Sequence, residues 1–344
     1  MLVVENGDVF TPAPRGKATI VVAGGRIEKI GNVSAANDLR AFDPEVVDAS
    51  GCIVVPGLID CHIHLIGGSG EKGFATATPA IAARELLDAG TTTVVGLLGT
   101  DTTTKTLPAL LAKVKGLRDE GLNAKMWTGG YDARTLTGSL RDDIVLIDEI
   151  IGAGELAIAD RRGMHYDARS LARIASDCYI AGTLTGKAGV LHLHTGELRE
   201  KLAIVRDVLE FGVPAASLQP THVNRNEALF AEAVELTKRG IAVDCDVVEE
   251  NLTKWLRLFD GDRSLLTIST DAPIGRVASL LEQVREASRV WSTEEALALA
   301  TRNPARILKL RDVGEIAEGK RADLLLLDAK TLELRRVIAG GRIG

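Results

Sequence analysis

Two histidines separated by a single residue, His62 and His64, are the part of this chain whose spacing indicates chemistry most directly. They follow a short apolar run at residues 53–59 that is typical of a buried strand. Residues two apart on a strand point to the same side, so both imidazoles should project together from the strand end. Two such imidazoles can form half of a metal site, although a pair of buried, hydrogen-bonded histidines would have the same spacing.

Polar residues also follow other apolar runs in the chain. After the run that ends at His64, further runs lie at residues 92–99, 123–129, 155–159, 189–194, 216–221, 240–246 and 265–270. The fifth, sixth and eighth strands of this series end at His194, His222 and Asp271. Glu155 begins the fourth strand, and Asp160 ends it. Four of the six histidines therefore fall at predicted strand ends, which chance placement does not explain.

Four imidazoles and two carboxylates supply enough ligands for two divalent ions, and zinc fits this mixture of nitrogen and oxygen donors. One carboxylate can bridge the two ions while another holds the attacking water. A pair of metal ions at short separation generates a hydroxide at neutral pH and polarises a carbonyl group. The sequence therefore predicts a metal-dependent hydrolase that acts on an amide or a related bond.

The apolar runs alternate with segments of helical periodicity, among them residues 79–88, 197–211 and 226–239. Eight strands alternating with helices predict an α/β fold, a (β/α)8 TIM-type barrel, which we place at residues 56–310. Such a barrel forms its active site at the C-terminal ends of its strands. Short strands without helices occur at residues 1–55 and 311–344, and we expect the two termini to join in one small β-sandwich domain.

Composition narrows the class of function. The chain has 344 residues, of which 46% are hydrophobic and 26% charged, as in globular proteins. Its net charge of -6 and the lack of a basic patch argue against nucleic acid as a partner. We see no signal peptide, no membrane span and no disulfide spacing among the four cysteines, so we expect a cytoplasmic protein that acts on a small-molecule substrate.

Several motifs resemble the amidohydrolase superfamily over nearly the whole chain. They are PGLIDCHIH at residues 56–64, TRNPA at 301–305 and GEIAEGKRAD at 314–323. Within that superfamily, the chain resembles the isoaspartyl dipeptidases most. Their pattern is matched by HLIGGSGE at residues 64–71, TTVVGLLGTD at 92–101, WTGGY at 127–131 and PTHVNRN at 220–226.

The resemblance implies a role for each matching residue. His62 and His64 match the ligands of a first metal ion, and His194 and His222 match those of a second. Asp271 matches the remaining ligand, which is also the proton shuttle. The residues that match substrate contacts are Glu71 for the α-ammonium, Tyr131 for the scissile carbonyl, Arg162 and Arg225 for carboxylates, and Thr100 and Gly70 in loops nearby.

The activity implied by this resemblance is hydrolysis of β-aspartyl (isoaspartyl) dipeptides by a hydroxide that bridges two divalent metal ions, with zinc as the expected metal. We also expect a homo-oligomer. The alternatives within the superfamily are an N-acyl-D-amino-acid deacylase and a cyclic-imide hydrolase similar to dihydroorotase. The deacylases have a cysteine on the second strand, and residues 91–99 contain none. A metal-free scaffold protein is a more remote alternative, because scaffolds of this kind lose the ligands that this chain keeps.

The chain departs from the superfamily pattern at two places. A carboxylated lysine is usual on the fourth strand, but no lysine lies between Lys125 and Lys187. The matching residue is Glu155, preceded by one extra residue within 151–154, and we expect Glu155 to bridge the metal ions, with Asp160 as the alternative. The loop after Asp271 is short and lacks a serine that is usual near the substrate.

Overall fold

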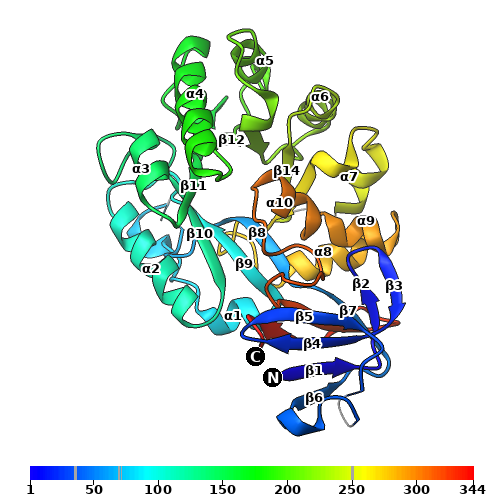
Figure 1. Cartoon of the computed structure of the whole chain (residues 1–344). Coiled ribbons are helices and arrows are strands. Elements are labelled where there is room, and N and C mark those ends of the chain that lie inside the picture. Colours follow the sequence, from blue (N-terminus) through cyan, green and yellow to red (C-terminus); the bar gives the residue numbers. More distant parts are fainter. Residues whose placement is uncertain (35–36, 69, 71, 249–251) are drawn as a thin grey trace.

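Parallel strands alternating with helices form the middle of the chain (Figure 1). The structure is a computed structural model and describes residues 1–34, 37–68, 70, 72–248 and 252–344. A six-stranded parallel sheet has the order β13-β12-β11-β10-β9-β8, and β14 pairs with β15 in a second parallel sheet. The strands are β8 (Leu58–Ile63), β9 (Thr91–Gly96), β10 (Asn123–Thr128), β11 (Ile150–Ile158), β12 (Val190–Thr195), β13 (Leu218–Thr221), β14 (Val243–Asp246) and β15 (Leu266–Ser269).

Backbone hydrogen bonds connect these two sheets at both edges. The amide of Val223, just after β13, donates to the carbonyl of Asp244 in β14 (3.4 Å). On the other side, the amide of His64 donates to the carbonyl of Ala272, just after β15 (2.7 Å). The parallel sheet is therefore curled, and the arrangement is consistent with the expected TIM-type barrel.

Helices cover the outside of the curled sheet (Figure 1). In α4, buried positions recur three or four residues apart, as at Leu171, Ala175 and Cys178, so one apolar face packs against the strands. The helices are α1 (Ala83–Asp88), α2 (Leu107–Asp119), α3 (Leu140–Leu146), α4 (Ala168–Thr185), α5 (Ala203–Leu209), α6 (Glu227–Lys238), α7 (Leu252–Leu258), α8 (Ser279–Ala287), α9 (Thr293–Ala298) and α10 (Arg302–Ile307). Short 3-10 turns are η1 (Arg40–Phe42), η2 (Phe74–Thr76), η3 (Ala215–Ser217) and η4 (Arg263–Leu265).

The eight predicted central strands are all present, but the start of the fourth was wrong. We expected Glu155 to begin this strand, whereas β11 begins at Ile150. Two glycines within residues 150–154 interrupt the apolar pattern and concealed the first half of the strand. Glu155 therefore lies toward the C-terminal end of β11, which is the end where a barrel forms its active site.

The two ends of the chain meet in one of two further sheets. One sheet, with the order β5-β4-β1-β6, is built from N-terminal strands alone. The other has the order β18-β17-β16-β7-β2-β3, in which the C-terminal strands meet the N-terminal ones where β16 pairs with β7. The N-terminal strands are β1 (Leu2–Glu5), β2 (Asp8–Phe10), β3 (Pro14–Lys17), β4 (Thr19–Ala23), β5 (Arg26–Gly31), β6 (Glu45–Asp48) and β7 (Cys52–Pro56). The C-terminal strands are β16 (Leu324–Asp328), β17 (Leu334–Ala339) and β18 (Arg342–Ile343).

A hairpin around Gly24 and Gly25 connects β4 and β5. Both glycines have positive φ angles, +56° and +78°, which a two-residue hairpin turn of this kind requires. Apolar side chains from both terminal sheets pack into one core, among them Val4, Ile20, Val22, Val54, Leu324 and Leu326. The assignment of residues 1–55 and 311–344 to a separate sandwich domain stays a prediction.

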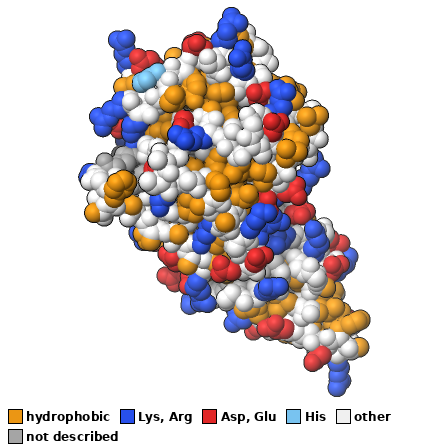
Figure 2. All heavy atoms as spheres, turned by 90° about the vertical axis from the view of Figure 1, so that its left-hand side faces the viewer, with side chains coloured by type: hydrophobic (Ala, Val, Ile, Leu, Met, Phe, Trp, Pro, Cys, Tyr) orange, Lys and Arg blue, Asp and Glu red, His pale blue; other side chains and the backbone are white. Residues whose placement is uncertain are grey.

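The surface mixes charged and apolar side chains. Figure 2 shows the side that lies at the left of Figure 1, where apolar side chains gather between charged ones. Exposed apolar residues on α3 and α4 are Leu146, Tyr179, Ile180 and Leu184. Among the described residues, no helix combines the length and the hydrophobicity needed to cross a bilayer.

Asp143 fixes the segment that follows β10, and its removal should destabilise the protein. Its buried carboxylate accepts hydrogen bonds from the hydroxyl of Thr128 and from the amides of Leu136 and Thr137 (both 2.8 Å). Asp143→Ala leaves these donors without an acceptor, so we expect the free energy of unfolding to fall by about 3 kcal/mol in urea denaturation.

Asp142→Ala is the matched control, because Asp142 is the neighbouring exposed residue on the same helix. It should cost less than about 1 kcal/mol, the usual range for a charge in the first turn of a helix. Equal costs for the two variants would contradict the role given to Asp143.

Candidate active site

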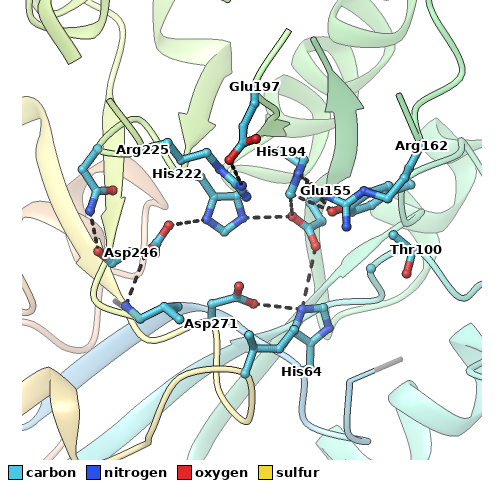
Figure 3. Close-up of a pocket in the computed structure, with 15 residues that line it drawn as sticks. His64, Thr100, Glu155, Arg162, His194, Glu197, His222, Arg225, Asp246 and Asp271 are labelled. Carbon is cyan, nitrogen blue, oxygen red and sulfur yellow. Dashed lines mark hydrogen bonds and ion pairs between the residues drawn. The ribbon is translucent and has the colours of Figure 1, made fainter. Parts of the chain in front are cut away.

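A cavity of about 370 Å³ opens at the C-terminal ends of the barrel strands (Figure 3). Its volume lies within the range of small-molecule sites. Polar groups dominate its lining, which includes His64, Thr100, Tyr131, Glu155, Arg162, His194, Glu197, His222, Arg225, Asp246 and Asp271. Most of the residues singled out from the sequence therefore meet in one place.

The carboxylate of Glu155 lies among four imidazoles. One of its oxygens is 3.0 Å from His194 Nδ1 and 3.6 Å from Nε2 of both His62 and His222, and the other oxygen is 3.8 Å from His64 Nε2. The side chain is only 2% exposed. Burial alone would raise the pKa of Glu155, but the surrounding imidazoles hold it well below its usual value. Glu155 is thus a buried residue of the site and not a surface residue.

A β-bulge in β11 places Glu155 there. The pairing of β11 with β12 shifts register between Ala153 and Leu156, so that Gly154 and Glu155 together lie opposite the single residue His192. A Cβ atom on Gly154 would be 2.6 Å from the carbonyl oxygen of His192, so only glycine fits at this position. The extra residue expected before Glu155 is therefore a bulge, and bulges commonly redirect a side chain beside an active site.

Asp271 approaches the first two histidines from the opposite side. Its Oδ1 atom is 3.0 Å from His64 Nε2 and 3.4 Å from His62 Nε2. Asp271 Oδ1 and His62 Nε2 are buried and have no hydrogen-bond partner among the described residues. Buried polar atoms are rarely left unpaired, so these two atoms need a further partner.

Divalent metal ions fit this requirement. Two groups of donors have ligand atoms within 4.8 Å of one another, His62 with His64 and Asp271, and His62 with Glu155 and His222. Imidazole nitrogens and carboxylate oxygens in this number suit zinc or a similar ion. The structure brings these expected ligands together, and their roles as ligands stay predictions.

Two of the histidines contact a further carboxylate through their second ring nitrogen. His222 Nδ1 is 2.6 Å from Asp246 Oδ2, and His194 Nε2 is 3.1 Å from Asp160 Oδ2. Burial disfavours the charged ring of His222, but Asp246 and Glu155 raise its pKa to about 10. Metal-binding histidines typically have such a partner, which fixes the ring and its tautomer.

Asp160, the alternative to Glu155 as the bridging carboxylate, lies outside both groups of candidate ligands. It accepts hydrogen bonds from the guanidinium of Arg162 (2.7 and 2.9 Å) and contacts the outer nitrogen of His194. Burial raises the pKa of Asp160, but Arg162 and His194 outweigh burial and hold it well below its usual value. Asp160 is therefore an anion that orients Arg162 and His194.

The expected substrate residues line the cavity with two exceptions. The Tyr131 hydroxyl is 3.0 Å from His194, and the Arg162 guanidinium lies 5.3 Å from the centre of the Tyr131 ring. Burial raises the pKa of Tyr131, so its hydroxyl stays protonated and can donate a hydrogen bond. Arg225 is 3.9 Å from the exposed Glu197. Thr100 also lines the cavity.

The two exceptions come from the loop after β8. Glu71 lies outside the described residues, so its predicted contact with an α-ammonium stays a prediction. Gly70 is described, but it is not among the residues that line the cavity. The short loop after Asp271 contributes Ile274 to the cavity lining instead of the missing serine.

Sequence reasoning missed Asp246 and Glu197. Asp246 ends β14 and follows Asp244 at the same two-residue spacing as His62 and His64, so the same strand argument could have found it. Glu197 lies in the loop after β12, where nothing in its local sequence distinguishes it from an ordinary surface acid.

Comparison with known proteins agrees with this geometry. The sequence profile described as "Amidohydrolase family" matches residues 53–344. A crystal structure of β-aspartyl dipeptidase from Fervidobacterium islandicum AW-1, in complex with β-Asp-Leu, superposes with a TM-score of 0.91 at 34% identity, covering 99% of this chain and 95% of that one.

Curated relatives at lower identity have other activities. Dihydroorotase from Syntrophotalea carbinolica is 25% identical over 83% of this chain and 68% of its own length. Adenine deaminase from Deinococcus deserti is 28% identical over 99% of this chain, which spans 59% of that enzyme.

Asp246 should support metal binding through His222. Asp246→Ala removes the partner of His222 Nδ1 and should weaken the binding of one metal ion by about 10- to 100-fold, measured by competition with a chelator. Asp246→Asn keeps an acceptor oxygen and should lose less. Glu197→Ala is the matched control, because Glu197 lines the same cavity but is 80% exposed. Unchanged affinity for every bound ion in Asp246→Ala would contradict this role.

Proposed function

The chain belongs to the amidohydrolase family, and we propose that it hydrolyses the isopeptide bond of β-aspartyl dipeptides at a centre that holds two divalent ions, with zinc as the expected metal. The observation that carries this proposal is the likeness to the β-aspartyl dipeptidase of Fervidobacterium islandicum, which covers 99% of the chain at 34% identity. Likeness in fold alone would not support a substrate, because one fold hosts many activities. Here the residues that line the cavity support it as well.

The proposed metal ligands are His62, His64, Glu155, His194, His222 and Asp271, with Glu155 between the two ions. The four imidazoles around the Glu155 carboxylate, at 3.0–3.8 Å, support this arrangement. When bound, two divalent ions would lower the pKa of a water molecule and polarise the scissile carbonyl. A scaffold that had lost its metal would not be expected to keep such a donor set buried.

The protein's own groups account for proton transfer and charge stabilisation in this proposal. The Asp271 carboxylate, held by His62 and His64, would accept a proton from the attacking water and deliver it to the leaving amine. The Tyr131 hydroxyl, neutral because burial raises its pKa, would donate to the oxygen that gains negative charge. Both groups line the cavity, so neither has to move far to reach a bound dipeptide.

Charged groups of the cavity support a dipeptide substrate with two carboxylates. Arg162 and Arg225 would each bind a carboxylate, while Glu71 would bind the α-ammonium. Arg162 is oriented by Asp160 (2.7 Å), and Arg225 forms a long ion pair (3.9 Å) with the exposed Glu197. A substrate carboxylate can therefore replace Glu197 beside Arg225 at little cost, because exposed ion pairs contribute little.

A cyclic-imide hydrolase is the second candidate, because dihydroorotase is among the curated relatives. Its substrate would also place one carboxylate near an arginine and one carbonyl near the metal ions. The two candidates differ in the need for an α-ammonium, which a cyclic imide lacks. We also propose that the chain forms a homo-oligomer. Its exposed apolar side chains on α3 and α4, Leu146, Tyr179, Ile180 and Leu184, are candidates for the interface.

Glu155→Gln should lose metal and most turnover. The wild-type protein should contain two divalent ions per chain by elemental analysis, and the variant fewer, because an amide is a poor bridging ligand. Activity of the wild type should not depend on bicarbonate, since no lysine requires carboxylation. Glu149→Gln is the matched control, because Glu149 is also buried but pairs with Arg118 before β11 begins. Full metal content and normal kcat in Glu155→Gln would exclude Glu155 as the bridge.

The metal-loaded enzyme should cleave β-Asp-Leu and should discriminate by charge. Charge-assisted contacts contribute about 1.5–3 kcal/mol each, so Arg225→Met or N-acetylation of β-Asp-Leu should lower kcat/KM about 10- to 100-fold. Arg199→Met is the control, because Arg199 is 95% exposed and does not line the cavity. If the enzyme leaves β-Asp-Leu intact but opens dihydroorotate or hydantoin, or deacylates an N-acyl-D-amino acid, the dipeptidase assignment is wrong.

A further inference from the structure

His192 contacts His62, one of the candidate metal ligands. It lies in β12, two residues before His194, and is completely buried. Its Nε2 atom is 2.8 Å from Nδ1 of His62. None of the comparisons gives His192 a role. The contact raises the question of which ring carries the proton between the two nitrogens.

The position of His62 decides this question. Its other nitrogen, Nε2, faces Asp271 at 3.4 Å and Glu155 at 3.6 Å and belongs to both groups of candidate ligand atoms. A neutral imidazole that offers a lone pair at Nε2 carries its proton on Nδ1. That proton points at His192, so His192 Nε2 must accept it and must itself be free of a proton.

The surroundings of His192 match this tautomer. With Nε2 unprotonated, the proton of His192 is on Nδ1 and needs an acceptor. Gln219 lies opposite His192 in the pairing of β12 with β13, and its amide donates to the hydroxyl of Thr267 (3.2 Å). This leaves the Gln219 oxygen available as an acceptor, and both that oxygen and His192 Nδ1 are buried and have no hydrogen-bond partner among the described residues.

The His192 ring is also held in place by packing. It stacks on Trp127 with ring centres 5.0 Å apart and planes 6° from parallel. The Trp127 indole donates to the carbonyl of Cys61, the residue before His62 (3.0 Å). On another side, the backbone of Gly154 approaches His192 so closely that a Cβ atom there would be 2.7 Å from the His192 Cβ. The acceptor nitrogen is therefore fixed relative to His62 and to the bulge that carries Glu155.

We propose that His192 is a positioning residue that keeps His62 in the tautomer with its proton on Nδ1 and its lone pair at Nε2 available for metal. A carboxylate or a backbone carbonyl usually accepts from a metal-binding histidine. Here the acceptor is a neutral imidazole, so it orients the His62 ring without placing a further negative charge beside that ring. The inference rests on the proposed metal centre but is independent of the proposed substrate.

Two variants separate the acceptor from the packing. His192→Phe keeps an aromatic ring against Trp127 but removes the acceptor, and His192→Gln supplies an acceptor oxygen on a side chain without a ring. We expect His192→Phe to weaken zinc binding about 10- to 100-fold in competition with a chelator, and His192→Gln to recover most of that loss. A purely structural role predicts the reverse order, because the ring stack would then matter more than the acceptor. Thermal unfolding of the metal-free variants shows whether each folds.

Nitrogen-15 NMR of the imidazoles tests the tautomer directly, and the chain has only six histidines to assign. In the zinc-loaded wild type, we expect a proton on His62 Nδ1 and on His192 Nδ1, and none on His192 Nε2. A proton on His192 Nε2, or zinc affinity in a folded His192→Phe equal to wild type, would overturn the inference. Failure of the wild type to bind zinc in the same titration would instead overturn the proposed metal centre.

Discussion

One buried negative charge organises the candidate site. The Glu155 carboxylate is 2% exposed, and a carboxylate in the interior is costly unless cationic or hydrogen-bonding groups surround it. Four imidazoles from β8, β12 and the end of β13 provide those groups at 3.0–3.8 Å. Removing any one of these side chains would leave the others facing an incompletely compensated charge, so their positions depend on one another.

The backbone reaches these positions through conformations that are unusual for ordinary residues. His222 and Asp271 have φ angles of +58° and +51°, in the left-handed region that side chains with a Cβ atom seldom occupy. His222 directly follows β13, and Asp271 lies two residues after the end of β15. The amide of Asp271 donates to the carbonyl of His62 (3.1 Å), which holds the segment after β15 against β8. Strain of this kind typically occurs at functional sites, where the surrounding structure maintains it.

The parts of the site that sequence predicted are those that follow from strand periodicity. His62, His64, His194 and His222 were found because each ends a short apolar run, and strand ends at one edge of a barrel converge. Asp246 also ends a strand and could have been found by the same argument, but its partner His222 follows a different strand, so the sequence does not indicate their contact. The burial of Glu155 and its place near the C-terminal end of β11 could not be predicted either. They depend on a bulge, which is set by the register between β11 and β12 and has no reliable signature within one strand.

The bulge in β11 also has a consequence for how such a centre can change over evolutionary time. A carboxylated lysine and a glutamate differ in reach by several bonds, and here the backbone carries an additional residue beside the shorter side chain. An exchange between the two solutions therefore requires both a substitution and the insertion or deletion of a strand residue. Either change alone leaves the carboxylate displaced from the four imidazoles. Under the proposed function, intermediates between the two forms would lack a carboxylate placed to bridge the metal ions, which would keep each lineage in the form it has.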